Sequence, residues 1–291
     1  MYSRKYFQLH FGSRALPLGK RTLIMGVLNV TPDSFSDGGK FFGVKRAVQH
    51  ALAMQRDGAD IVDIGAESTR PGSLAISAAE ELRRLLPVLE ALRGILKIPI
   101  SVDTQKSAVA ELALGAGAGI VNDISGLRND PELARVAAKY GAPLILMHRR
   151  GTPRTMQLGP FARNVVRDVL SGLRKSIATA KKYGVQRSQI VIDPGIGFGK
   201  SYSQNYELLA KLPELAKLGY PVMVGTSRKG FLGARSGKNG KPASPDERIW
   251  GTAATVAASI LNGAHMVRVH DVAEMKQVAL TIDALLCANT S

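Results

Sequence analysis

The sequence is poor in cysteine and in long apolar runs. Its one cysteine, Cys287, excludes a disulfide within the chain and favours a reducing, cytoplasmic location. No apolar stretch reaches the roughly 20 residues that a membrane-spanning helix needs. The first ten residues are polar and basic, without the apolar centre of a secretory signal. We therefore expect a cytoplasmic protein that does not associate with membranes.

Acidic and aromatic residues are also scarce. The chain of 291 residues has 39 Lys and Arg against 23 Asp and Glu, so its net charge is +16. Such a balance suits an anionic ligand or nucleic acid, although a general solubility bias would also produce it. The basic residues form no dense run, and aromatic residues make up only 5% of the chain. We expect an acidic small molecule as the ligand rather than nucleic acid.

Apolar, strand-like segments alternate with amphipathic, helical segments along almost the whole chain. The expected strands cover residues 22–30, 61–64, 98–102, 119–123, 143–147, 189–192, 221–225 and 264–269. The expected helices cover residues 44–56, 78–92, 107–114, 131–140, 162–183, 206–218, 245–262 and 272–286. Pro213 should kink or split one of these helices. The strands are short and continuously apolar, as in a parallel sheet covered on both faces.

These eight repeats predict a single α/β domain. Asn29 and Arg268 lie 239 residues apart (268 − 29) over seven repeats, about 34 residues for each β/α unit. The pattern predicts a (β/α)8 TIM barrel over residues 21–291, after a short N-terminal extension or hairpin over residues 1–20. An open, doubly wound sheet is the alternative, but such sheets more often have fewer strands.

Polar and charged residues follow every expected strand, whereas the helix ends carry far fewer. Residues 191–200 (VIDPGIGFGK) show the pattern: a buried strand stops at Asp193, and Pro194 and three glycines follow. Catalytic residues of (β/α)8 barrels lie at the carboxyl ends of the strands. A solvated barrel end needs only ordinary turn residues, so the asymmetry predicts an active site.

The strand ends resemble those of the dihydropteroate synthase family of pterin-binding enzymes. Over roughly residues 21–285, the motifs that match in the family's order are NVTPDSFSDGG (29–39), DIGAESTRPG (63–72), SVDT (101–104), NDISG (122–126), LMH (146–148), IDPGIGFGK (192–200), GTSRKGFLG (225–233) and VRVHDV (267–272). The resemblance implies a (β/α)8 transferase of folate biosynthesis. Such an enzyme condenses 6-hydroxymethyl-7,8-dihydropterin diphosphate with p-aminobenzoate, giving 7,8-dihydropteroate and diphosphate.

The resemblance also implies the residues of the site. Those expected to bind the pterin are Asp103, Asn122, Ile124, Met147, Asp193, Lys229 and Arg268. Those expected to bind diphosphate are Asn29, Thr69, Arg70, Arg268 and His270. Those expected to bind p-aminobenzoate are Phe35, Ser68, Thr69, Pro71, Phe198, Ser227 and Lys229. The expected catalytic residues are Asp33, Thr69, Arg70 and Lys229.

The chemistry of these side chains suits the implied reaction. Asp103, Asn122 and Asp193, expected at three neighbouring strand ends, could pair with the donor edge of a pterin, since a carboxylate can accept two hydrogen bonds. A loop-capping role is the alternative for Asp103 and Asn122. The planar guanidinium of Arg268 can stack on the ring and also meet phosphate. Diphosphate would leave first, in a dissociative, SN1-like substitution, so no covalent nucleophile is needed.

One metal ligand, two lids and a homodimer are further implications of the resemblance. Asn29 alone is a poor metal site, so Mg²⁺ would arrive with the phosphates of the substrate. Loops 31–39 and 67–73 would close over the diphosphate. Sulfonamides would compete with p-aminobenzoate.

The sequence departs from the family pattern at a few positions. Arg149 stands where the family often has Met, Gly230 where it usually has Ser, and Ala66 where Gly is common. Two other functions compete with synthesis. A methyltransferase using a folate and a corrinoid would share the pterin aspartates but lack Lys229 and the ESTRPG loop, and a non-catalytic paralogue would bind pterin diphosphate only.

Overall fold

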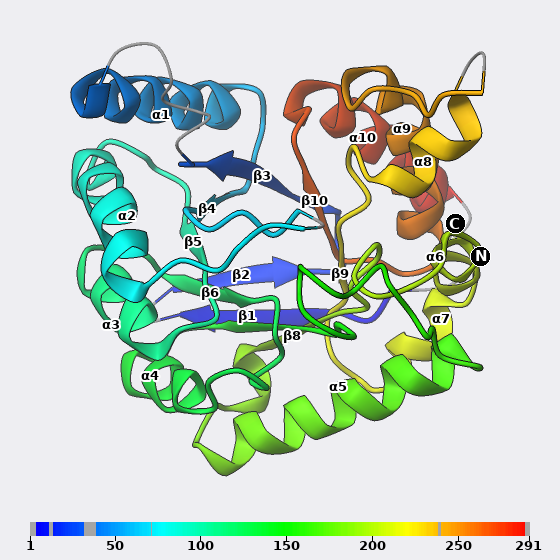
Figure 1. Ribbon diagram of the computed structural model, residues 1–291, viewed down its shortest axis with the longest axis horizontal. Coiled ribbons are helices and arrows are strands. Elements are labelled where there is room, and N and C mark those ends of the chain that lie inside the picture. The colour runs from blue at the N-terminus through cyan, green and yellow to red at the C-terminus, as the bar shows by residue number, and fades with distance from the viewer. Residues whose placement is uncertain (1–3, 12–13, 32–38, 71, 238–239, 289–291) are drawn as a thin grey trace.

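The computed structural model describes residues 4–11, 14–31, 39–70, 72–237 and 240–288. The chain starts with an antiparallel hairpin of β1 (Phe7–Phe11) and β2 (Arg14–Leu18). Strands and helices then alternate (Figure 1). Among the described residues, no helix is long and apolar enough to cross a membrane.

Eight parallel strands form the central sheet of the described chain. They are β3 (Leu23–Asn29), β4 (Ile61–Gly65), β5 (Ile100–Asp103), β6 (Ile120–Asp123), β7 (Leu144–Met147), β8 (Ile190–Asp193), β9 (Met223–Val224) and β10 (Met266–Val269). Their order in the sheet is β8-β7-β6-β5-β4-β3-β10-β9. A parallel bridge between Ile192 and Val222 joins the two edge strands and closes the ring. The predicted (β/α)8 barrel is therefore confirmed.

Helices cover the outside of this ring (Figure 1). They are α1 (Gly39–Arg56), α2 (Ala78–Leu92), α3 (Ser107–Gly115), α4 (Glu132–Tyr140), α5 (Val165–Lys182), α6 (Tyr202–Ala210), α7 (Leu212–Ala216), α8 (Gly230–Ser236), α9 (Ile249–Leu261) and α10 (Val272–Ala288). As predicted, the segment containing Pro213 is split, into α6 and α7. As expected from the sequence, α4 is capped at its start by Asp130, whose side chain accepts from Glu132 N, and ends at Gly141 in the left-handed conformation.

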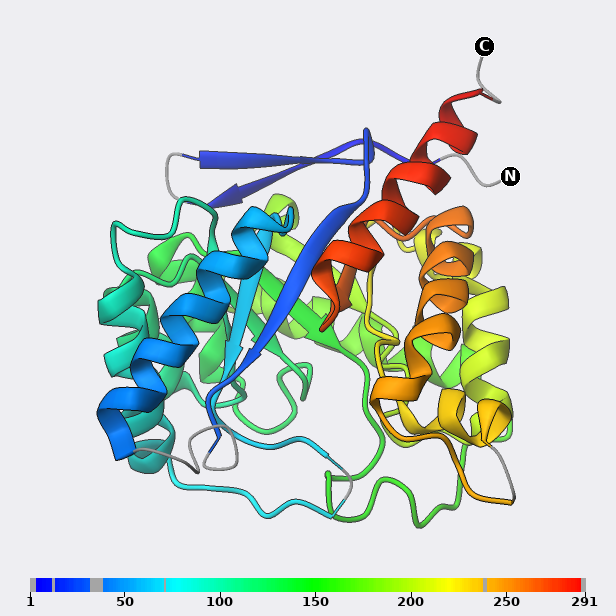
Figure 2. The same cartoon turned by 90° about the horizontal axis from the view of Figure 1, so that it is seen from above.

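The barrel interior and the hairpin share one apolar cluster. Side chains from all the barrel strands except β5 pack inside the ring, and Leu9 and Leu18 of the hairpin, 0% and 1% exposed, join them. Figure 2 shows the hairpin across one end of the barrel, with the loops that follow the strands at the opposite end. Burying each leucine contributes about 1.5–3 kcal/mol, which holds the hairpin against the barrel. The hairpin thereby seals the amino end of the barrel. The division into an extension over 1–20 and a barrel over 21–291 stays a prediction.

Candidate active site

Four strand ends bring one arginine and three acidic or amide side chains together. Arg268 of β10 donates from Nε to Asp63 Oδ2 of β4 at 2.7 Å and from Nη2 to Asp103 Oδ2 of β5 at 2.9 Å. Asn122 of β6 donates from Nδ2 to the same Asp63 oxygen at 3.0 Å. The barrel closure thereby creates a connected polar network at its carboxyl end.

Two acceptors of this network are buried and find no donor among the described residues. They are Asp63 Oδ1 and Asn122 Oδ1. A buried polar atom without a partner costs about 1–3 kcal/mol, and native proteins keep few of them. A ligand with N–H groups at its edge would satisfy both atoms, so the network is suited to a donor-rich ligand.

The charges within the network are unequal, since one cation faces two carboxylates. Burial raises the pKa of Asp103 to about 8, and the guanidinium of Arg268 opposes this rise. Burial would lower the pKa of Arg268, but Asp63 and Asp103 outweigh it and the pKa is raised. Because burial disfavours the charged form of Asp103 more than Arg268 stabilises it, Asp103 can hold a proton near neutral pH and donate a hydrogen bond.

A second group of side chains follows β8 and β9. Asp193 is 5% exposed, and its Oδ1 accepts from Gly195 N at 2.7 Å. Lys229 donates to Ile196 O, and its Nζ lies 4.7 Å from the centre of the Phe198 ring. Burial lowers the pKa of Lys229 to about 8, against the opposing effect of Asp193. Burial also raises the pKa of Asp193, and Lys229 opposes that rise.

The strand order corrects one expectation about these residues. Asp103 and Asn122 do lie on paired strands, β5 and β6, in register with each other. Asp193 does not follow directly, because β7 lies between β6 and β8 and places Met147 opposite Asp193. Met147 and Ile124 are 3% and 5% exposed and add apolar surface between the two polar groups.

Ser227 and His270, predicted for different substrates, contact each other. The Ser227 Oγ lies 2.9 Å from His270 Nδ1 and accepts from His270 N at 3.1 Å. Burial lowers the pKa of His270 to about 4, and Arg268 lowers it further, so the imidazole is neutral at pH 7. Asn29 is exposed at the end of β3, the strand that pairs with β10.

The loop after β4 carries the expected lid residues. Ser68 and Thr69 are half-buried, and Arg70 is exposed. The Ser73 hydroxyl donates to Ser68 O at 2.6 Å, and Gly72 N donates to Pro153 O at 3.0 Å, so this loop touches the loop after β7. Three predicted site residues lie outside the described residues: Asp33, Phe35 and Pro71.

Sequence reasoning left Asp63 out of the predicted site. Its signal was a single charge inside an otherwise apolar strand, IVDIG.

The departures from the family pattern lie beside the site. Arg149 is 1% exposed and donates from Nη2 to Gln105 Oε1 at 3.3 Å, Gly230 begins α8, and Ala66 is buried.

The fold and these strand ends are those of a pterin-binding barrel. Residues 25–270 match the family described as pterin binding enzyme, which covers most of the chain. The buried acceptors at the barrel mouth agree with that class, because a pterin presents N–H donors along one edge.

Proteins similar to this chain narrow the class further. Dihydropteroate synthase of Synechocystis is 48% identical over 277 residues, covering 95% of this chain and 94% of that protein. The Xanthomonas albilineans dihydropteroate synthase structure with 4-aminobenzoic acid has a TM-score of 0.89, 41% identity and coverage of 97% and 99%. The Yersinia pestis dihydropteroate synthase structure with a sulfonamide drug complex has a TM-score of 0.89, 39% identity and coverage of 97% and 100%. This chain belongs to the dihydropteroate synthase family, as its motifs predicted.

Proposed function

We propose that the carboxyl end of this barrel binds a dihydropterin diphosphate and condenses it with p-aminobenzoate. The main support for this proposal is the network around Arg268. Its buried acceptors on Asp63 and Asn122, which have no donor among the described residues, match the N–H donors of a pterin ring. Asp193 and Lys229 would bind the opposite part of the ring, with Ile124 and Met147 as apolar walls. A protonated Asp103 would donate to a ring nitrogen.

The leaving diphosphate would meet the positive side of the site. Arg268 and the exposed Asn29 lie on paired strands, and His270 follows β10. Thr69 and Arg70, in the loop after β4, would also contact the diphosphate. Groups that are in place before charge develops stabilise a departing anion without reorganisation. The C–O bond to diphosphate would break first, and the nitrogen of p-aminobenzoate would then form the new C–N bond.

Mg²⁺ would be held mainly by the substrate. The described residues contain no cluster of three or more His, Cys, Asp or Glu side chains that could hold a metal. Asn29, exposed at the end of β3, can offer one amide oxygen, which fits an ion that keeps phosphate and water as its other ligands. When bound, Mg²⁺ would neutralise phosphate charge.

The p-aminobenzoate would lie on the Phe198 side of Lys229. Ser68 and Thr69 of the loop after β4 would border this side, together with the predicted Phe35 and Pro71. The hydroxyl of Ser227 is shared with His270, so a carboxylate bound there would also feel that neutral imidazole. The 4-aminobenzoic acid in the X. albilineans structure supports this second substrate, and the Y. pestis complex supports competition by sulfonamides.

Diphosphate release tests the proposal directly. Purified protein with Mg²⁺, dihydropterin diphosphate and p-aminobenzoate should release diphosphate, and omission of p-aminobenzoate should stop it. Asp193→Asn should abolish pterin binding, because the amide presents one donor where the pterin needs acceptors. Asp57→Asn, at the exposed residue that follows α1, is the control. If diphosphate release does not depend on p-aminobenzoate, the chain binds pterin diphosphate but is not a synthase.

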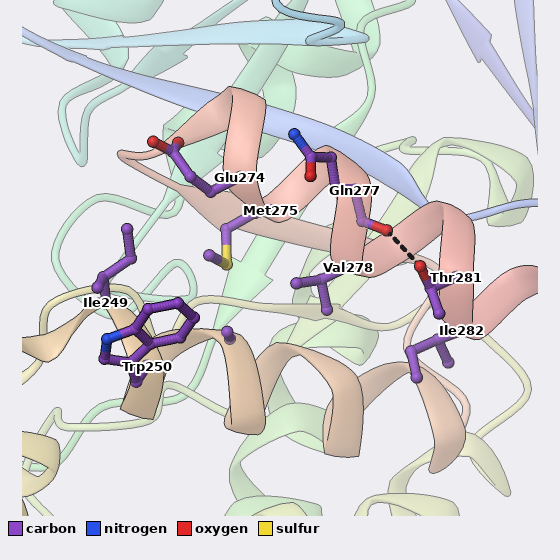
Figure 3. Close-up of a pocket in the computed structure, with 9 residues that line it drawn as sticks. Ile249, Trp250, Glu274, Met275, Gln277, Val278, Thr281 and Ile282 are labelled. Carbon is purple, nitrogen blue, oxygen red and sulfur yellow. Dashed lines mark hydrogen bonds between the residues drawn. The ribbon is translucent and has the colours of Figure 1, made fainter.

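An apolar groove between α9 and α10 supports the predicted homodimer (Figure 3). The groove has a volume of about 410 Å³, and Trp250 at its edge is 82% exposed. Large exposed apolar patches mark association surfaces, and in a homodimer a second copy would cover this one. Light scattering should give twice the chain mass, and Trp250→Glu should halve it. Leu112→Glu, an exposed residue of α3, should leave the mass unchanged.

A cytoplasmic location stays a prediction. It follows from the single cysteine of the sequence.

A further inference from the structure

Lys200 ends the glycine-rich loop after β8 and is one of the largest fully buried side chains, 1% exposed. Its ammonium donates to His148 O and to Phe198 O, both at 3.0 Å, and lies 3.1 Å from His148 Nδ1. Within the described part of the chain no carboxylate forms a salt bridge with it. An ammonium buried without a salt-bridge partner is costly, so its three contacts need an explanation beyond packing.

The three contacts join two loops of the site. His148 belongs to the loop after β7, and Phe198 belongs to the loop after β8. Burial lowers the pKa of His148 to about 2, and Lys200 lowers it further, so the imidazole is neutral and its Nδ1 can accept from the ammonium. Burial lowers the pKa of Lys200 to about 7. In its charged form all three N–H groups have an acceptor, and each acceptor belongs to one of the two loops.

Glycines let the two loops approach closely enough for this contact. A Cβ on Gly195 would lie 1.9 Å from His148 O, and one on Gly199 would lie 2.4 Å from Arg150 O. Both glycines also have positive φ, 67° and 70°. The Phe198 carbonyl accepts from Arg150 N at 3.5 Å as well as from Lys200. The backbone of Phe198 is thus held from two sides.

The position of Phe198 matters because its ring faces Lys229. The Lys229 ammonium is 4.7 Å from the ring centre and donates to Ile196 O in the same loop. A cation over an aromatic face contributes about 0.5–2 kcal/mol when it is desolvated. Fixing the Phe198 carbonyl therefore also fixes the contact between the ring and Lys229.

We propose that Lys200 is a positioning residue for the second substrate: its buried ammonium fastens the loop after β8 to the loop after β7 and sets Phe198 against Lys229. It does not touch substrate itself. The proposal rests on the proposed function, because Phe198 is assigned there to p-aminobenzoate. The pterin network around Arg268 lies on other strands. Asp193 and Lys229, which would also bind the ring, border the fastened loops, so the fastening should affect pterin binding less than p-aminobenzoate binding.

Lys200→Met tests the proposal, since it removes the ammonium and keeps the unbranched stem. The KM for p-aminobenzoate at saturating pterin diphosphate should rise about tenfold, the effect of losing hydrogen bonds to a charged group. The Kd for pterin diphosphate, measured by calorimetry, should change less than about twofold. Lys217→Met, at an exposed lysine, is the matched control. An unchanged KM, or an equal loss of pterin affinity, would overturn the proposal.

A double mutant separates positioning from general loosening. If Lys200 acts through Phe198, adding Lys200→Met to Phe198→Ala should raise the KM for p-aminobenzoate no further, because the ring to be positioned is gone. Multiplicative effects of the two changes would contradict the proposal. If Lys200→Met does not unfold cooperatively, Lys200→Gln, which keeps an amide donor, replaces it in every measurement.

Hydrogen exchange without substrate distinguishes this proposal from the proposed function. Amides of residues 148–151 and 195–199 should exchange faster in Lys200→Met, while those of β7 should not change. Unchanged exchange in both loops would disprove the fastening, whatever the enzyme catalyses. If the unmutated chain releases no diphosphate in response to p-aminobenzoate, the proposed function is wrong. The exchange result would still decide whether Lys200 fastens the two loops.

Discussion

The two ends of the barrel each pair an arginine with a buried carboxylate, but they satisfy that carboxylate differently. At the amino end, Arg4 pairs with Asp283 of α10, and Asp283 also accepts from Thr22 N at 2.6 Å and from the Thr22 hydroxyl at 2.9 Å. At the carboxyl end, Arg268 pairs with two carboxylates. The first cluster has both carboxylate oxygens bonded, whereas the second leaves buried acceptors free among the described residues.

This difference separates a structural cluster from a binding cluster. A fully bonded network holds the N-terminal segment and α10 against the start of β3, and nothing remains for a ligand to contact. A network with open acceptors carries a cost in the free protein that a ligand can recover. The pairing of an arginine with aspartate is therefore not enough to identify a site, and the free atoms beside the pair are the informative feature.

The largest effect is expected at the amino end, on stability. Asp283→Ala leaves Arg4 and the Thr22 amide buried without their carboxylate, in a pair with side chains only 5% and 11% exposed. Breaking such a pair should lower the free energy of unfolding by about 3–5 kcal/mol. Denaturant unfolding measures this loss, and kcat/KM of the folded fraction should not change. A fall in pterin affinity would show that the two ends are not independent.

The next effect is expected at the carboxyl end, on binding. Asn122→Leu keeps the side-chain shape and removes the free Oδ1 acceptor together with one bond to Asp63. Pterin affinity should fall about 10–100-fold, because a buried donor of the ligand loses its partner. The free energy of unfolding should change by less than about 1 kcal/mol. Calorimetry would measure the affinity and denaturant unfolding the stability of the same preparation. A larger loss of stability than of affinity would mean that this network is structural, like the one at the amino end.

The pH dependence of binding should follow Lys229. Its pKa of about 8 in the folded chain lies below the ordinary 10.5 because of burial, so pterin affinity should decline as the pH rises through about 8 and the ammonium donor is lost. Stability should respond in the opposite direction. The unfolded chain binds more protons at this lysine between pH 8 and 10.5, so the contribution of Lys229 to the unfolding free energy rises over that interval.

Lys229→Met provides the control for both trends. Subtracting its pH profiles from those of the unmutated chain isolates the lysine from other groups that titrate nearby, Asp103 among them. The difference in affinity should disappear above about pH 10, where both chains lack the charge. A difference that stays constant with pH would mean that the charge of Lys229 is not what binds the pterin.

The smallest effect is expected at a solvated ion pair. Lys211 and Glu207 lie 3.2 Å apart with side chains 51% and 40% exposed. Lys211→Met should change the free energy of unfolding by less than about 0.5 kcal/mol, because water screens such a pair. The same assays as for Asp283→Ala measure it. A change of several kcal/mol would show that burial is not what makes the ion pairs at the barrel ends costly to break.

Much of the site was readable from sequence because its signals are local. A carboxylate or amide placed directly after an apolar strand marks the barrel mouth, as for Asp103, Asn122 and Asp193, and eight matching motifs fixed the family. What the sequence did not indicate was contact between distant segments. Arg268 binds Asp63 across 205 positions, and Ser227 binds His270 across 43. Such partners depend on the order of the strands around the ring.

The sequence by itself determined the repeating β/α units, the helix ends at Asp130 and Gly141, the break at Pro213 and the family. These follow from burial periodicity and backbone preference, which act over a few residues. Only the tertiary structure decided that β7 separates Asp193 from Asn122, that the hairpin seals the amino end and that Lys200 is buried between two loops. Closing the barrel sets these contacts, since closure decides which strand ends meet and which polar atoms lose water.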